Sequence, residues 1–77
     1  MTFGERVKRL RKGLGLSQTE VSERMHGIIG RTNISRVESG LLFPTADKLP
    51  LLANALEEHI ESLFYDEFGD PVVIGHE

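Results

Sequence analysis

The sequence contains no cysteine and no long apolar run. Without cysteine, a disulfide framework and a thiolate metal site are both excluded. A bilayer span needs about 20 apolar residues, and no run approaches that length. No signal peptide is visible at the N-terminus. We therefore expect a soluble, cytoplasmic protein of one domain with no membrane partner.

Residues with catalytic or metal-binding chemistry are also scarce. His26, His59 and His76 are widely separated and have no partner at metal-ligand spacing. No nucleophile is arranged with a base, and no glycine loop of the phosphate-binding type is present. The sequence thus predicts no metal, no cofactor and no enzymatic activity.

The formal net charge of −3 is unevenly distributed along the chain. Residues 1–40 carry eight basic and four acidic side chains, whereas residues 41–77 carry one basic and eight acidic. A basic half joined to an acidic half predicts that only one face meets phosphates. The alternative is that these charges are scattered over a solvated surface.

Residues 17–40 are typical of two short helices joined by a glycine-marked turn. Ser17 and Glu20 have the spacing of a capping box, which predicts a helix start. Gly40 predicts a left-handed stop at the far end. This layout is a helix-turn-helix, whose second helix can enter the DNA major groove. Apolar residues recur three or four apart on both sides of the turn: Val21, Met25, Ile34 and Val37.

The flanking segments predict further helices. Thr2 and Glu5 form a second capping box, so a helix is expected from about residue 3 to Gly13. Residues 45–56 have helical spacing, but Pro50 requires a late or distorted start. Residues 57–65 are expected to form a fifth helix, and residues 72–74 a short strand. The predicted fold class is therefore all-α, a five-helix bundle with a short extension.

Three strings, FGERVKRLRKGLGLSQTEVSERM, TNISRVESGLLFP and LPLLANALEEHIESLF, together resemble the Cro/CI-type helix-turn-helix family, also called the xenobiotic-response-element type. The likeness covers about residues 3–64. It implies a lambda-repressor-like DNA-binding domain at residues 1–66 that binds double-stranded operator DNA as a homodimer, followed by an extension at 67–77. Two features depart from the family: the turn at 26–30 is about two residues too long, and the loop at 41–43 lacks basic residues.

The resemblance also implies which residues meet DNA. Arginine suits guanine because its fork matches the O6 and N7 acceptors. The alternative for Arg31 and Arg36 is a solvated helix charge, and Asn33 and Ser35 either touch phosphates or only decorate the helix. The implied base-reading residues are Arg31, Thr32 and Arg36, and the implied phosphate contacts are Ser17, Gln18, Asn33, Ser35 and Arg11.

A structural ion pair between Arg11 and Glu38 is also implied, tying the first helix to the second helix of the motif. In the family this arginine is structural, although it can also meet a phosphate. The alternative is an exposed Glu38 in a helix C-terminal turn, where a negative charge is unfavourable. The remaining basic residues of the first helix are expected to act by long-range attraction: Arg6, Lys8, Arg9 and Lys12.

The extension is too apolar for a free tail. One hypothesis is that it buries a two-fold dimer interface, and the other is that it folds back and caps its own core. The candidate interface residues are Phe64, Tyr65, Phe68, Val72, Val73 and Ile74.

We interpret the sequence as a sequence-specific DNA-binding transcriptional regulator, repressor-like, that places the second helix of its motif in the major groove of an inverted-repeat operator. The rival reading is a protein-interaction module or antitoxin component that keeps the fold and regulates through a partner protein. The acidic second half and the apolar loop at 41–43 motivate the rival. Arg31 and Arg36 argue against it.

Overall fold

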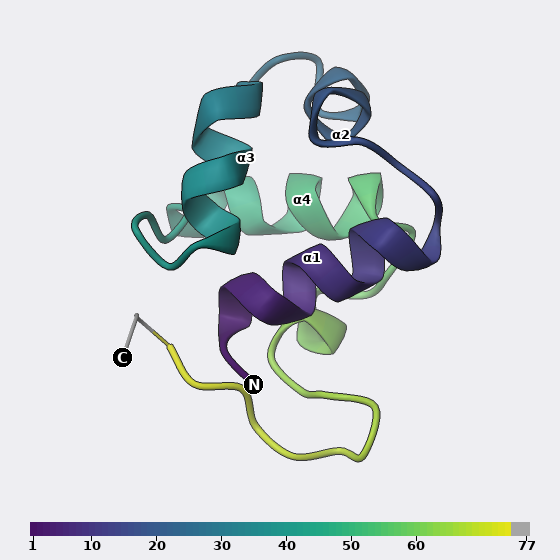
Figure 1. The fold of residues 1–77 in the computed structure, drawn as a ribbon, viewed down its shortest axis with the longest axis vertical. Coiled ribbons are helices and arrows are strands. Elements are labelled where there is room, and N and C mark those ends of the chain that lie inside the picture. Colours follow the sequence, from purple (N-terminus) through teal and green to yellow (C-terminus); the bar gives the residue numbers. More distant parts are fainter. Residues whose placement is uncertain (75–77) are drawn as a thin grey trace.

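The structure, a computed structural model, describes residues 1–74 and is an all-α bundle (Figure 1). In Figure 1, α1 crosses the front with α4 behind it, the α2–α3 turn lies at the top, and the segment after η2 lies at the bottom. The elements are α1 (Phe3–Gly13), α2 (Gln18–Arg24), α3 (Arg31–Glu38), the 3₁₀ turn η1 (Ala46–Lys48), α4 (Leu49–Ala55) and the 3₁₀ turn η2 (Ile60–Leu63).

Both predicted capping boxes are present. Thr2 Oγ1 accepts a hydrogen bond from the Glu5 amide at 3.0 Å, and the Glu5 carboxylate accepts one from the Thr2 amide at 2.8 Å. Ser17 and Glu20 make the same two bonds at α2, at 3.0 and 2.8 Å. In each box the backbone hydrogen bond lowers the pKa of the glutamate, because it stabilises the ionised carboxylate.

All four α-helices end with a residue in the left-handed region, followed by an amide that bonds back into the last turn at 2.8 to 3.1 Å. Gly15 ends α1 in this way and Gly40 ends α3, with φ of 71° and 83°. His26 ends α2 and Glu57 ends α4, with φ of 55° and 60°. A non-glycine residue at such a position costs about 1–2 kcal/mol.

The backbones of α1 and α3 approach each other closely at Gly4. A Cβ atom built on Gly4 would lie 2.3 Å from the carbonyl oxygen of Val37 and 2.5 Å from that of Glu38. Only glycine permits this approach, which sets the N-terminal end of α1 on the C-terminal carbonyls of α3. The buried apolar side chains form one cluster: Phe3, Val7, Val21, Met25, Ile29, Ile34, Val37, Leu49, Leu52, Ala53, Ala55, Leu56, Leu63 and Val72.

The prediction of a fifth α-helix from residue 57 to 65 is wrong. The chain forms only a 3₁₀ turn over Ile60–Leu63. The physical reason lies at the end of α4, where the Arg24 guanidinium donates to the Ala55 carbonyl at 3.0 Å and to the Glu57 carboxylate at 2.9 Å. Because Glu57 leaves helical geometry and the Ala55 carbonyl is already bonded, α4 does not continue.

The late start predicted for the helix around Pro50 is confirmed. The 3₁₀ turn η1 follows Thr45, and α4 begins only at Leu49, so Pro50 lies in the first turn. There the missing proline N–H removes no intrahelical bond.

The prediction of a strand at 72–74 is also wrong for the residues that the structure describes. Val73 instead makes an isolated bridge to Thr2, in which its amide donates to Met1 at 3.0 Å and its carbonyl accepts from the Phe3 amide at 2.9 Å. A strand needs a longer ladder, and the N-terminal segment turns into α1 immediately after this pair.

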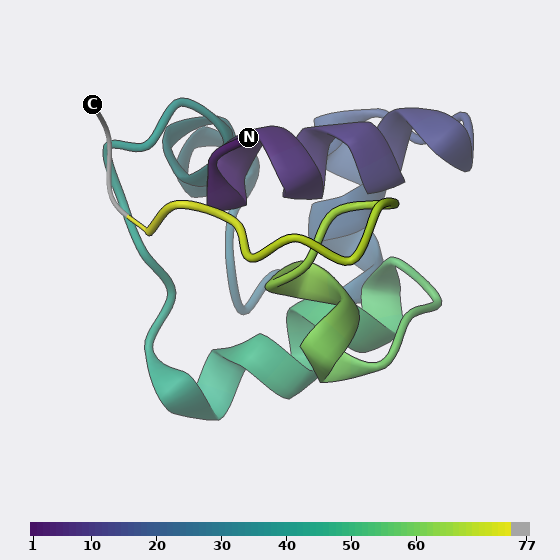
Figure 2. The same ribbon diagram turned by 90° about the horizontal axis from the view of Figure 1, so that it is seen from below.

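The tail folds back on its own bundle. Figure 2 shows it running beside α1 toward the loop between α3 and η1. Val72 is only 8% exposed and belongs to the core, and its amide donates to the Phe64 carbonyl at 2.9 Å. The described part of the tail thus packs on its own bundle, and the two-fold interface suggested for this segment stays a prediction. Residues 75–77, with His76, lie outside the described part.

Candidate nucleic-acid interface

The outer face of α3 is polar and exposed. Ile34, Val37 and Glu38 are buried, so these positions face the bundle and the other positions of the helix face solvent. Arg36 donates to the Asn33 side-chain oxygen at 3.3 Å, which joins two of the implied DNA contacts on one side of the helix. Every other implied contact on α3 is exposed as well: Arg31, Thr32 and Ser35.

A buried ion pair fixes α3 to α1. Arg11 Nε lies 2.6 Å from one carboxylate oxygen of Glu38, and Arg11 Nη2 lies 2.9 Å from the other. The two side chains are 10% and 4% exposed. Hydrogen bonding to Glu38 raises the pKa of Arg11, because it stabilises the charged guanidinium.

The third nitrogen of the Arg11 guanidinium is also used within the protein, since Nη1 donates to the Leu16 carbonyl at 2.9 Å. Both sides of the guanidinium are therefore engaged in holding α1, α3 and the connection to α2. This geometry favours the structural role of Arg11 over the phosphate contact.

The start of α2 joins the same network. Gln18 Nε2 donates to Glu38 at 3.1 Å, so one side-chain amide hydrogen is used internally. A glutamine amide has two such hydrogens, which leaves one for another acceptor. The Ser17 hydroxyl accepts the capping bond from Glu20. Thr19, the next residue of α2, is also exposed, although the family resemblance did not imply it as a DNA contact.

Two of the basic residues on α1 are paired with the tail. Arg9 lies 3.0 Å from Glu67, and Arg6 lies 3.7 Å from Glu67 and donates to the Ser62 carbonyl at 3.0 Å. Sequence reasoning missed this use of Arg6 and Arg9, although the acidic extension opposite a basic helix was a signal for it. Lys8 and Lys12 are exposed and have no ion-pair partner within residues 1–74.

The apolar loop at residues 41–43, after α3, packs against the bundle through Phe43. The Phe43 ring centroid lies 4.8 Å from that of Phe3 and 6.4 Å from that of Phe64. This cluster binds the loop to α1 and to the end of η2. The loop where the family resemblance implies basic residues is therefore occupied here by a packing contact.

No three His, Asp or Glu side chains within residues 1–74 are arranged to hold a metal ion. None of the helices in this part of the chain is long and apolar enough to cross a membrane.

A helix-turn-helix family model, HTH_3, matches residues 7–63. The chain belongs to this helix-turn-helix family. The family contains the Cro/C1-type DNA-binding transcription regulators, so the resemblance is confirmed and the domain belongs to a non-enzymatic class.

Solved helix-turn-helix structures share the fold of this one. The restriction-modification controller protein C.AhdI from Aeromonas hydrophila is 31% identical with a TM-score of 0.75, over 80% of this chain and 87% of that one. The P22 c2 repressor, solved in complex with a synthetic operator, is 25% identical with a TM-score of 0.74, over 82% of this chain and 92% of that one.

A curated helix-turn-helix relative is longer. The transcriptional activator BcrR of Enterococcus faecalis is 31% identical over 67 residues, which are 87% of this chain and 32% of that protein. The chain thus spans about a third of the length of this relative.

Proposed function

We propose that this helix-turn-helix domain is a sequence-specific DNA-binding transcriptional regulator, repressor-like, which places α3 in the major groove of an inverted-repeat operator. The observation that carries the proposal is the outer face of α3. It presents exposed polar side chains while the buried contact of Arg11 with Glu38 fixes its orientation. The similar P22 c2 repressor was solved on an operator, which supports the same use of the fold.

The two arginines of α3 are the proposed readers of guanine. Arg31 stands at the first position of the helix, and Arg36 lies on the exposed face with Asn33 beside it. A bidentate arginine–guanine contact contributes about 1–3 kcal/mol of discrimination. Thr32, between them in sequence, suits a thymine methyl group or a phosphate.

The proposed phosphate contacts flank this face. Gln18 offers its second amide hydrogen at the start of α2, and Ser17 stands beside it at the cap. Asn33 and Ser35 are exposed and complete the set on α3. Such contacts fix the position of the protein on the duplex without reading sequence.

Selection of bound duplexes from a random DNA pool tests the proposal. The wild type should select an inverted repeat, since a two-fold dimer places two recognition helices about 34 Å apart. Arg36→Ala should lose the preference at one base pair of each half-site, about 1–3 kcal/mol. Lys48→Ala removes a basic side chain outside α2 and α3 and should leave the consensus unchanged. If Arg36→Ala leaves it unchanged too, the placement of α3 is refuted.

The second candidate function is a protein-interaction module or antitoxin component that acts through a partner protein. Leu41, 69% exposed just after α3, is the observation that favours it. A salt titration of binding to random duplex separates the two functions, because a DNA-binding protein loses affinity steeply as salt rises. A regulator of the first kind acts in the cytoplasm on double-stranded operator DNA, whereas the second need not contact DNA at all.

A further inference from the structure

A cavity of about 160 Å³ lies beside α3. The turn at 26–30 and the loop at 41–43 both contribute to it, so the two segments in which the sequence departs from its family meet at one place. Neither departure has a role in the proposed contacts with DNA. The lining residues are Ile28, Ile29, Asn33, Leu42, Phe43, Pro44, Thr45 and Lys48.

Backbone hydrogen bonds hold both of these segments in place. The amides of Gly27 and Ile28 bond back to the last turn of α2 at 2.9 and 3.1 Å. The amides of Leu41 and Leu42 bond to the Arg36 carbonyl at 2.8 and 3.3 Å. The cavity is therefore formed by the fold itself, as small-molecule sites usually are.

Most of the lining is apolar and open to solvent. Ile28, Leu42 and Phe43 are 49%, 39% and 41% exposed. Exposed apolar side chains that gather around a cavity are typical of a binding site. The volume suits a single ring, because an engineered cavity of about 150 Å³ in another protein binds benzene. It lies below the range of about 300–1,000 Å³ that is typical of sites for drug-sized ligands.

Two lining residues offer hydrogen-bond donors to an anion. Lys48 is the one charged residue of the lining and has no ion-pair partner within residues 1–74. Its neighbour Asp47 is engaged by the Thr45 side chain, whose hydrogen bond lowers the pKa of Asp47. The Asn33 side-chain oxygen accepts from Arg36 at 3.3 Å, which leaves its NH₂ group to donate elsewhere. An ammonium and an amide beside an apolar cavity suit a carboxylate.

We propose that this cavity binds a small aromatic carboxylate and that the bound ligand lowers the affinity of α3 for DNA. The ring packs on Ile28, Leu42 and Phe43, and the carboxylate binds Lys48 and the Asn33 amide.

The effect on DNA rests on the proposed function, in which Asn33 contacts a phosphate. A carboxylate that binds the Asn33 amide takes the donor which the phosphate would use. It also places a negative charge beside the DNA-binding face, where it repels the phosphates. Ligand and duplex therefore oppose one another, and each lowers the affinity for the other by the same factor.

Titration of the full chain with sodium benzoate tests the ligand site without DNA, followed by NMR of the backbone amides. The shifts should saturate and should centre on residues 28–48. Lys48→Ala should raise the benzoate dissociation constant at least about tenfold, because it removes a charge-assisted hydrogen bond. Benzamide has the same ring without the charge, so the wild type should bind it at least about tenfold more weakly than benzoate. Lys48→Ala should remove most of this preference.

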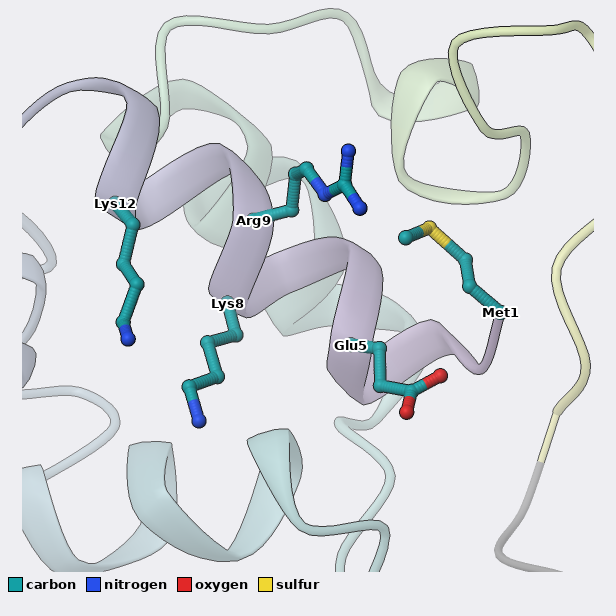
Figure 3. Close-up of a pocket in the computed structure, with 5 residues that line it drawn as sticks. All are labelled: Met1, Glu5, Lys8, Arg9 and Lys12. Atoms are coloured by element: carbon teal, nitrogen blue, oxygen red, sulfur yellow. The ribbon is translucent and has the colours of Figure 1, made fainter.

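A second hollow, on α1, supplies the matched control. Figure 3 shows Lys8 and Lys12 extending from one side of this helix, and the hollow measures about 400 Å³. Lys12→Ala removes the same charged group as Lys48→Ala and should leave the benzoate dissociation constant unchanged. Circular dichroism checks that both variants are folded. The residues that line the hollow are Met1, Glu5, Lys8, Arg9 and Lys12.

Three results would overturn the ligand site. They are shifts that do not saturate, shifts that centre on the hollow of α1, and a Lys48→Ala variant that binds benzoate as tightly as the wild type. The first is also the result expected if the cavity receives a side chain of a partner protein instead of a small molecule.

Binding to the duplex selected from the random pool tests the effect on DNA. Saturating benzoate should raise the duplex dissociation constant of the wild type relative to sodium chloride at the same ionic strength. Lys48→Ala should respond much less, and equal affinity of the wild type in the two salts overturns the coupling. A chain that binds benzoate but selects no DNA refutes the proposed function and with it the coupling. A chain that selects DNA but does not bind benzoate overturns this inference alone.

Discussion

Removal of Arg11 should destabilise the fold far more than removal of its neighbour Lys12. The pair with Glu38 is almost fully buried, at 10% and 4% exposure, and both its hydrogen bonds are short. Arg11→Ala leaves a buried carboxylate with only the Gln18 amide as a polar partner, a cost of about 3–5 kcal/mol. A chain of 77 residues has a total stability of about 4–12 kcal/mol, so much of it is lost.

Urea and thermal melts followed by circular dichroism measure this effect. A loss of 3 kcal/mol or more lowers the melting temperature of a domain of this size by at least about 12 °C. Lys12→Ala removes an exposed charge one position away and should stay within about 0.5 kcal/mol of wild type. Replacing both Arg11 and Glu38 by apolar residues should restore most of the stability, since no charge is then left buried. Equal midpoints for Arg11→Ala and Lys12→Ala would refute the reasoning.

Three further predictions concern local features. Gly4→Ala should destabilise by about 1–3 kcal/mol through its clash with α3, whereas Gly13→Ala, with no atom within 4 Å of the new methyl group, should stabilise by about 0.4–1 kcal/mol in the same melts. His26→Gly should raise stability by up to about 1 kcal/mol by removing strain at φ 55°; a lower midpoint contradicts this. The capping box lowers the pKa of Glu20 from its ordinary value of 4.5. The stability that the ionised carboxylate gives to the fold is therefore present above pH 4.5, and it is lost as the pH falls through the lower pKa of the folded state. Glu20→Gln should flatten this pH dependence of stability in melts at about pH 2–7.

The structural features that are determined by a few adjacent residues could be predicted from the sequence. The capping boxes at Thr2 and Ser17, the glycine stop at Gly40 and the delayed helix after Pro50 each follow from a few adjacent residues, and the structure contains all of them. The spacing of Ile34 and Val37 similarly predicted which face of α3 is buried.

The predictions that the structure contradicts concern elements that depend on contacts between residues far apart in the sequence. The fifth helix is interrupted because Arg24, more than 30 positions earlier, binds the end of α4. The strand at 72–74 is replaced by a single bridge to Thr2, because the N-terminal segment with which Val73 pairs turns into α1 immediately afterwards. Neither follows from periodicity, which describes one segment at a time.

Only part of the candidate site could be predicted from the sequence. The contact of Arg11 with Glu38 could be named from the family resemblance, and the structure brings the two side chains together. The pairing of Arg6 and Arg9 with Glu67 could not, because the sequence does not show which of the eight acidic residues after residue 40 lies beside α1.

The bridge between Thr2 and Val73 has a consequence for biosynthesis. The Phe3 amide, in the first turn of α1, donates a hydrogen bond to the Val73 carbonyl, its only acceptor among the described residues. Translation proceeds at about 5–20 residues per second, so the 70 positions between them take about 4–14 s to emerge. During that interval the first helix of the bundle lacks the contact that completes it. A nascent chain stalled before Val73 should therefore expose the start of α1 to proteases that the completed domain resists.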